Sequence, residues 1–247
     1  RTTVFFKGCP LRCVWCQNPE SLRPEPEMAL LADRCRRSGQ CAGACPSGAI
    51  SFATGGGSVR LDRGRCDACG ECVRACAFGA WWTVGRRVSV GTLADEVERD
   101  RCFYEPSGGG VTLSGGEPTF QMTAAAALAA RCRERGLSVG LQTCGAFLWE
   151  DFAPHADLFD FIQFDLKLAD REEHRRLTGA DNRAIFDNAK RLLKAGAAVE
   201  FRMPVVPGLT DGVDNLDGLA DWLDALGVRS LELIEYHAMG KHKLRWL

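Results

Sequence analysis

The sequence predicts an α/β protein in which parallel strands alternate with helices, and into which a small cysteine-rich domain is inserted. Six short runs of β-branched and aromatic residues are separated by helical stretches, which is typical of βαβ units. Between about residues 31 and 84 the composition changes to seven cysteines with many Gly and Ala. The 247 residues suffice for one large α/β barrel or two smaller domains. We therefore expect a main domain of residues 1–30 and 85–247 and an insert of residues 31–84.

The elements of the main domain can be placed from local patterns. The expected strands are 2–6, 111–113, 138–141, 161–164, 199–203 and 231–234. The expected helices are 92–100, with Thr92 as N-cap, then 123–135, 184–195 and 215–226. Periodicity alone does not decide whether these strands form an open sheet or close into a partial barrel.

Composition and charge exclude several function classes. The chain has 31 basic and 32 acidic residues, so there is no basic surplus for nucleic acid or an anionic membrane. No apolar run approaches the roughly 18–20 residues that a membrane helix needs. The chain opens at Arg1 inside a strand-like run and ends abruptly at Leu247, so we expect terminal residues to be missing from this sequence.

The cysteine content is unusual. Ten of the thirteen cysteines lie before residue 77 in short clustered spacings, and Cys102, Cys132 and Cys144 stand alone. Disulfide frameworks usually belong to short secreted chains, of under about 100 residues. Clustered cysteines in a longer chain favour metal ligation in a reducing compartment, so we expect a cytoplasmic protein.

The first cysteine cluster has the spacing C-x3-C-x2-C and follows the first strand. Cys9, Cys13 and Cys16 supply three thiolates, which can hold three irons of a cubane cluster and leave the fourth iron open. An open metal position is what a catalytic site needs. Tetrahedral zinc is the alternative, but no fourth Cys or His lies nearby in the sequence. In parallel α/β folds, sites lie at the carboxyl ends of strands, which is where this cluster begins.

The insert carries a bacterial ferredoxin pattern in two copies. The complete copy is C-x2-C-x2-C-x3-C, with Ala77 where Pro is usual, and in the other copy Ser38 occupies the second cysteine position. Because the fourth cysteine of such a run ligates the other cluster, one cluster is expected to be held by Cys66, Cys69, Cys72 and Cys45. The other is expected to be held by Cys35, Cys41 and Cys76. The fourth corner of this second cluster is bound by Ser38, bound by another ligand, or vacant. This half of the insert accordingly holds a 4Fe-4S cluster, a 3Fe-4S cluster or no cluster.

The motif from Cys9 to Cys16 resembles that of the radical S-adenosylmethionine (SAM) enzymes. The longer stretch from Phe5 to Ser21 resembles the opening of the glycyl-radical-enzyme activating enzymes, the group that contains pyruvate formate-lyase activase. The resemblance covers essentially the whole chain. It implies a partial (β/α)6 barrel and a 4Fe-4S cluster that cleaves SAM reductively to a 5′-deoxyadenosyl radical. That radical would abstract hydrogen from a backbone glycine of a partner glycyl radical enzyme, with flavodoxin or ferredoxin as electron donor.

The same resemblance implies a set of SAM contacts. Glycines in Ser114-Gly115-Gly116-Glu117-Pro118 allow close approach to a ligand. Residues i and i+2 of a strand share a face, so Asp165 and Lys167 can point at one ligand. Arg202 can fork onto a carboxylate. The full expected set is Trp15, Gly115, Gly116, Glu117, Asp165, Leu166, Lys167, Arg202 and His237.

One position departs from the activase pattern, and two other functions stay open. Gln142 is neutral where pyruvate formate-lyase activase has an Asp that helps to bind a monovalent cation, so that cation site is doubtful here. The alternatives are a radical SAM enzyme acting on a small molecule or peptide, and a ferredoxin-type electron carrier. The second does not explain the three-cysteine motif.

Overall fold

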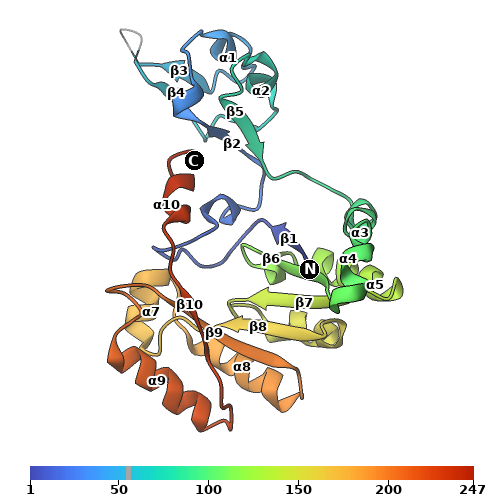
Figure 1. Ribbon diagram of the computed structural model, residues 1–247. Helices are drawn as coiled ribbons and strands as arrows, with labels where there is room; N and C mark the ends of the chain where they lie inside the picture. Colours follow the sequence, from blue (N-terminus) through green and yellow to red (C-terminus); the bar gives the residue numbers. More distant parts are fainter. Residues whose placement is uncertain (54–56) are drawn as a thin grey trace. The chain divides into compact units, whose positions relative to one another are not determined.

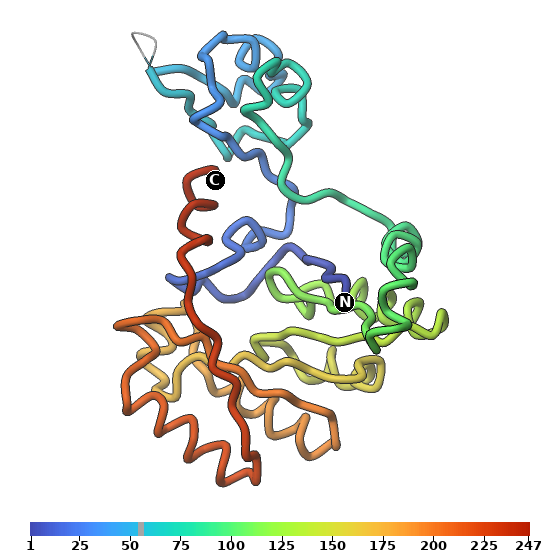
Figure 2. Tube along the Cα trace, viewed as in Figure 1, coloured from blue at the N-terminus to red at the C-terminus, as the bar shows by residue number. Residues whose placement is uncertain are grey.

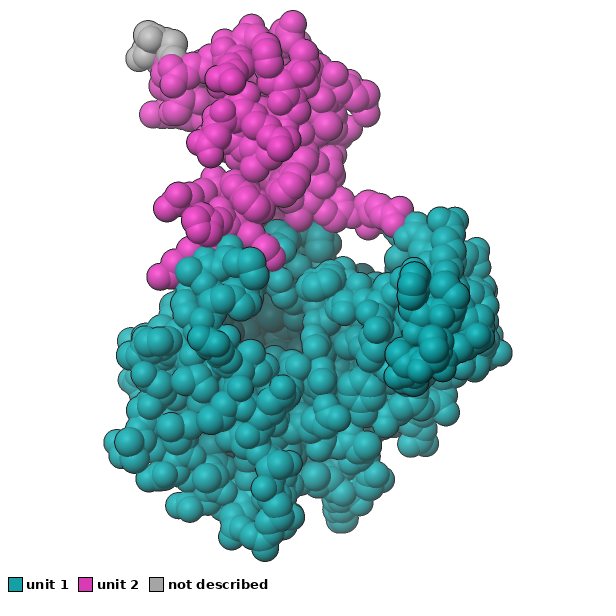
Figure 3. Space-filling view, in the orientation of Figure 1, with its two compact units in different colours: residues 1–24, 88–240 teal, residues 25–87, 241–247 magenta. Residues whose placement is uncertain are grey.

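The computed structural model describes residues 1–53 and 57–247 and falls into two compact units. Unit 1 comprises residues 1–24 and 88–240, and unit 2 comprises 25–87 and 241–247 (Figure 3). Unit 2 therefore includes the last seven residues, which the sequence analysis assigned to the main domain. In the described part of the chain, no helix has the length and apolar character needed to cross a membrane.

Unit 1 is built on one sheet of six parallel strands (Figure 1). The strands are β1 (Thr2–Phe6), β6 (Gly110–Gly115), β7 (Ser138–Thr143), β8 (Phe161–Asp165), β9 (Val199–Val205) and β10 (Glu232–Glu235). Their order in the sheet is β1-β6-β7-β8-β9-β10, so each strand is added beside the one before it. All six expected strands are present, with ends that differ by up to two residues. All carboxyl ends therefore lie at one edge of the sheet, where the loops can form a site.

Helical segments lie between these strands, and one follows the last strand, as the trace in Figure 2 shows. They are η1 (Pro19–Ser21), α3 (Val90–Glu98), α4 (Arg101–Ser107), η3 (Pro118–Gln121), α5 (Met122–Glu134), α6 (Trp149–Phe152), η4 (Ala153–Leu158), α7 (Arg171–Thr178), α8 (Arg183–Lys194), α9 (Val213–Asp224) and α10 (Met239–Lys243). The expected helix 92–100 begins earlier, because Ser89 is the N-cap and its Oγ accepts a hydrogen bond from the backbone N–H of Thr92 at 3.1 Å. The prediction of Thr92 as the cap was wrong.

The two faces of the sheet differ in chemistry. One face carries buried apolar residues, including Leu113, Leu141 and Phe164, which belong to the same core cluster as residues of α3, α5, α8 and α9. The opposite face carries polar residues on neighbouring strands, including Ser114 and Gln142. An open doubly wound sheet has helices on both faces, whereas a barrel has them only outside. Here α3, α5, α8 and α9 pack on the apolar face, as in a barrel, so the polar face is available to line a site.

Unit 2 contains two antiparallel pairs of short strands and two short helices. Strands β2 (Glu27–Leu30) and β5 (Trp81–Val84) pair antiparallel, as do β3 (Ile50–Phe52) and β4 (Val59–Leu61). The other elements are η2 (Ala32–Arg34), α1 (Gln40–Gly43) and α2 (Glu71–Ala75). The C-terminal segment joins this unit, because Leu30 N–H donates to the Trp246 carbonyl at 2.9 Å and Trp82 packs edge-on against Trp246.

Candidate functional site

The loop after β1 carries the first three cysteines and is anchored by backbone hydrogen bonds. Gly8, with φ of +97°, donates to the Ser21 carbonyl at 2.7 Å. The N–H groups of Arg12 and Val14 donate to the carbonyls of Thr178 and Leu177, at 2.7 and 3.0 Å. These two carbonyls lie at the C-terminus of α7, where helical carbonyls have no partner within the helix. The N–H groups of the cysteine loop thus satisfy these helix-terminal carbonyls, and the same hydrogen bonds hold the loop against α7.

The three cysteines of this loop lie close enough to influence one another electrostatically. Burial raises the pKa of Cys13, and it raises the pKa of Cys16 to about 11, with a further increase from the neighbouring thiols. Residues 1–53 and 57–247 contain no group of three or more His, Cys, Asp or Glu side chains placed to hold a single metal ion. A cubane cluster makes a different demand, because each thiolate binds a different iron. The donor set, three adjacent thiols, fits a 4Fe-4S cluster better than zinc.

Gly115 and Gly116 are required by the cysteine loop itself. A Cβ on Gly116 would lie 2.4 Å from the Gly8 carbonyl oxygen, and one on Gly115 would lie 2.5 Å from the backbone of Phe6. Glu117 N–H donates to that same Gly8 carbonyl at 2.8 Å. From the sequence we expected these glycines to admit a ligand, and this stays a prediction. The structure shows that they also allow the close approach of the β6 loop to the backbone that carries Cys9.

Glu117 is a buried carboxylate that connects the ends of β6 and β7. Its Oε1 accepts hydrogen bonds from the hydroxyls of Thr119 and Thr143, at 2.8 and 2.9 Å, and from Thr119 N–H. Its Oε2 accepts one from the N–H of Cys144 at 2.7 Å. Only 1% of the residue is exposed, so these contacts replace the water that a carboxylate would otherwise bind. Oε2 retains acceptor capacity for a further donor.

Asp165, Lys167 and Arg202 form a charged group at the carboxyl end of β8, where Arg202, from the middle of β9, pairs with Asp165. Asp165 Oδ1 accepts from Nε and Nη2 of Arg202, at 3.1 and 2.7 Å. Lys167 Nζ lies 3.9 Å from Asp165 Oδ2, which confirms that these i and i+2 side chains point together. Burial opposes the charge on Lys167, but Asp165 and the nearby cysteines outweigh it and raise the pKa of this amine. The lysine is therefore a fixed positive charge beside the cysteine loop.

The remaining predicted SAM-binding residues, Trp15, Leu166 and His237, differ in burial and in their surroundings. Trp15 is buried in an apolar cluster with Leu168, Leu177 and Val206. The Leu166 side chain lies in the main core and its N–H donates to the Arg202 carbonyl, so only its own carbonyl is left for a ligand. His237 is exposed just beyond the end of β10.

A row of amide side chains crosses the polar face of the sheet, and the sequence analysis did not anticipate it. Ser114 Oγ donates to Gln142 Oε1, and Gln142 Nε2 donates to Gln163 Oε1 at 2.8 Å. Arg202 Nη1 also donates to Gln163 Oε1, at 3.0 Å. The strand registers, which pair Gln142 with Gln163, were needed to find this row. Both ends of the Gln142 amide group are therefore engaged in this row of hydrogen bonds. Gln142 also provides no carboxylate that could bind a cation at this position.

Cys144 is the second site residue that the sequence analysis did not single out. It is buried, follows β7, and makes a side-chain contact with Cys9 that raises the pKa of Cys144 and lowers that of Cys9. Its N–H is held by Glu117. The signal available in the sequence was its position directly after a strand, like that of the Cys9 loop.

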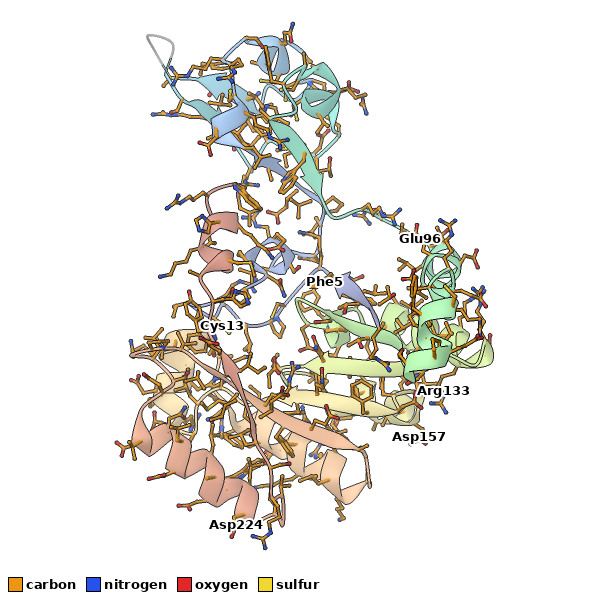
Figure 4. The ribbon with its side chains drawn as sticks, in the orientation of Figure 1. Phe5, Cys13, Glu96, Arg133, Asp157 and Asp224 are labelled. Atoms are coloured by element: carbon orange, nitrogen blue, oxygen red, sulfur yellow. The ribbon has the colours of Figure 1, made fainter. Side chains whose placement is uncertain are left out.

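Together these residues meet at one edge of the sheet in unit 1. The space-filling view shows a hollow in this unit, in the region where Figure 1 draws the loop after β1 and the neighbouring strand ends (Figure 3). Cys13 is labelled in the stick view (Figure 4). The site thus combines three thiols, a positive amine and an Asp–Arg pair, which suits a metal cluster beside a zwitterionic ligand.

Five of the seven cysteines of unit 2 belong to a separate apolar cluster. Cys41 and Cys72 are buried with Ile50 and Trp81, and Cys45, Cys66 and Cys76 pack against them. Burial raises the pKa of Cys72 to about 11. All thirteen cysteines of the chain are free thiols. The thiols of unit 2 form a donor set that suits iron–sulfur clusters.

Comparisons with known proteins agree with this arrangement. The family profile "Radical SAM superfamily" matches residues 68–223, and the profile "4Fe-4S dicluster domain" matches residues 27–77. The trans-4-hydroxy-L-proline dehydratase activating enzyme of Clostridioides difficile is 40% identical over 98% of this chain and 81% of that enzyme. The choline trimethylamine-lyase activating enzyme of Oleidesulfovibrio alaskensis is 38% identical over 100% of this chain and 81% of that enzyme.

Further similarities extend to a third activating enzyme and to a solved fold. The benzylsuccinate synthase activating enzyme of Thauera aromatica is 36% identical over 100% of this chain and 76% of that enzyme. The structure "Native anSMEcpe with bound AdoMet" matches with a TM-score of 0.54 at 14% identity, covering 96% of this chain and 52% of the other. At that identity the match concerns the fold alone.

Proposed function

Because the chain belongs to the activating enzymes of glycyl radical enzymes, within the radical SAM superfamily, we propose that Cys9, Cys13 and Cys16 hold its catalytic 4Fe-4S cluster. When bound, the cluster and SAM supply a one-electron cleavage that yields methionine and a 5′-deoxyadenosyl radical, which takes a hydrogen atom from a backbone glycine of the partner enzyme. The protein supplies position and exclusion of competing reactions. The observation that carries the proposal is the meeting of the cysteine loop with Glu117, Lys167 and Arg202 at one sheet edge.

The charged residues of the site are proposed to orient SAM. Its methionine part carries an amino and a carboxylate group, and its sulfonium is positive. Lys167 and Arg202 offer positive charge for the carboxylate, and the segment Gly115-Gly116-Glu117 offers acceptors for the amino group. Asp165 keeps Arg202 oriented through two hydrogen bonds to one oxygen. Trp15, the Leu166 carbonyl and His237 complete the proposed set.

Unit 2 is proposed to be a ferredoxin-like insert that carries electrons to the catalytic cluster. One cluster would use Cys66, Cys69, Cys72 and Cys45, and the other Cys35, Cys41 and Cys76, with Ser38 at the fourth corner. Flavodoxin or ferredoxin would be the external donor. The sheet of unit 1, with helices packed on one face, supports a partial (β/α)6 barrel. Free thiols throughout the chain suit a reducing cytoplasm.

A direct experiment tests the radical transfer. The full chain is reconstituted anaerobically with iron and sulfide, reduced, and incubated with SAM and candidate glycyl radical enzymes, and electron paramagnetic resonance (EPR) is recorded. We expect a glycyl doublet on one partner, and none when the partner's radical glycine is replaced by alanine. SAM cleavage without a doublet on any candidate would favour the small-molecule or peptide alternative, and no cleavage at all would contradict the proposal.

A further inference from the structure

The two halves of unit 2 repeat one backbone conformation 31 residues apart, as Cys35 corresponds to Cys66 and Ser38 to Cys69. The glycines that precede α1 and α2, Gly39 and Gly70, both have φ of +81°. The glycines after the two helices, Gly48 and Gly79, both have φ of +57°. The half with the serine therefore keeps the fold of the half with four cysteines.

The most telling repeat is at the residue before the variable position. Arg37 and Ala68 have φ of 57° and 56°, and they are the non-glycine residues with positive φ in the described chain, residues 1–53 and 57–247. This left-handed conformation is unfavourable for a residue with a Cβ atom. In one half this conformation directly precedes Cys69, a proposed cluster ligand. In the other half the same conformation directly precedes Ser38, at the equivalent position.

The remaining cysteines of the serine half match their counterparts as well. Cys41 is buried at the second position of α1, as Cys72 is in α2. The sulfur of Cys45 accepts a hydrogen bond from Ala49 N–H at 3.3 Å, and that of Cys76 accepts one from Ala80 N–H at 3.4 Å. Such N–H···S contacts stabilise thiolate ligands. Both Ser38 and Cys69 are exposed, so the fourth corner faces solvent in each half.

We propose that the serine half still holds a cluster, on the thiolates of Cys35, Cys41 and Cys76, and that the iron beside Ser38 is labile. This rests on the proposed function of unit 2 as a carrier of two clusters. A hydroxyl oxygen is a harder and weaker ligand for this iron than a thiolate, and it must lose a proton to bind. An oxidant such as ferricyanide takes one electron from the 4Fe-4S cluster, and one ferrous ion departs. A 3Fe-4S cluster that retains all four sulfides remains.

The test must separate this cluster from the catalytic one, which also has an open iron. We use the full chain with Cys9, Cys13 and Cys16 replaced by alanine, and in parallel the unaltered chain with SAM bound. After anaerobic reconstitution each is titrated with ferricyanide, and EPR and protein-bound iron are measured. We expect a 3Fe-4S signal in both proteins and a loss of about one iron per chain.

Two substitutions make the result specific. Ser38→Cys should remove the 3Fe-4S signal and retain about one more iron per chain after oxidation. The mirror variant Cys69→Ser should about double the signal, because both halves would then have a hydroxyl corner. The proposal is overturned if the unaltered chain gives no 3Fe-4S signal, if Ser38→Cys leaves the signal unchanged, or if the iron count before oxidation corresponds to one cluster in unit 2. None of these readouts depends on SAM cleavage, so failure of the catalytic proposal is recognised separately.

Discussion

The two cysteine-bearing regions are held in place by different means. The loop with Cys9, Cys13 and Cys16 depends on partners far away in the sequence, since its N–H groups bind carbonyls at the end of α7 and its Gly8 carbonyl binds Glu117 N–H. The cysteine segments of unit 2 depend on short repeated turns, with matching glycine conformations 31 residues apart. Substitutions in the strands and helices of unit 1 should therefore affect the first site while sparing the second.

The largest effect is expected for Cys13→Ala. Two thiolates do not hold a cubane cluster, so SAM cleavage should be abolished, while the clusters of unit 2 remain. Iron analysis and EPR of the reduced protein, with and without SAM, measure both. Cys102→Ala, at an exposed cysteine outside both regions, is the matched control and should change neither. Retained 5′-deoxyadenosine production in Cys13→Ala would refute the assignment of the first site.

The next effect is expected for Gly116→Ala. Its Cβ would meet backbone atoms of Gly8 and Ser21, at 2.4 and 2.7 Å, which cannot rotate away. We expect a loss of about 3 kcal/mol in the free energy of unfolding of unit 1 and poor assembly of the catalytic cluster. Denaturant unfolding followed by tryptophan fluorescence, with the iron count, checks this.

Gly212→Ala is its control, because no atom lies within 4 Å of the added Cβ and the backbone there has an ordinary φ of −64°. Wild-type stability in Gly116→Ala would mean that the close approach of the two loops is not required. Equal losses of all clusters would mean that the regions are not independent.

A smaller effect is expected for Glu117→Gln. The amide group would place a donor where one carboxylate oxygen accepts from Thr143 or Cys144, leaving a buried N–H unsatisfied. The cost should be about 2 kcal/mol in stability, and the affinity for SAM should also fall. Thermal unfolding and equilibrium binding of SAM measure these effects. Glu134→Gln, on the exposed end of α5, should match the unaltered chain, and an equal loss there would remove the special role of Glu117.

The smallest effect is expected for Arg202→Lys. Lysine keeps the charge but not the two N–H groups that reach Asp165 Oδ1. We expect SAM to bind about tenfold more weakly, which corresponds to about 1.4 kcal/mol, with little change in cluster content. Arg229→Lys alters an exposed Arg–Asp pair and should leave binding unchanged. Unaltered SAM binding in Arg202→Lys would show that the fork geometry is unimportant.

The contrast between the two regions also explains what the sequence could predict. Ligand spacing is local, so the C-x3-C-x2-C loop and the ferredoxin-like repeat were readable, and so were the six strands and their alternation with helices. Residues that act across the sheet were not. Gln163 joins Gln142 and Arg202 only through strand register, and Cys144 meets Cys9 only because β7 ends at the same edge as β1.

The sequence also did not predict where distant segments of the chain approach one another closely. Gly115 and Gly116 were predicted to admit a ligand, and the sequence did not indicate the neighbouring backbone that they also accommodate. The membership of 241–247 in unit 2 rests on contacts of Trp246 with Leu30 and Trp82, which lie more than 160 residues away in sequence. Such long-range packing has no local signal.

Reductive cleavage of SAM by the Cys9–Cys16 site is tested most directly by analysing the cleavage products. The anaerobically reconstituted full chain is given a low-potential one-electron reductant and SAM, without any partner enzyme, and the mixture is analysed by chromatography. We expect 5′-deoxyadenosine and methionine in equal amounts, together with an EPR spectrum of the reduced cluster that changes when SAM is added. An identical spectrum with and without SAM, and no 5′-deoxyadenosine, would contradict this expectation.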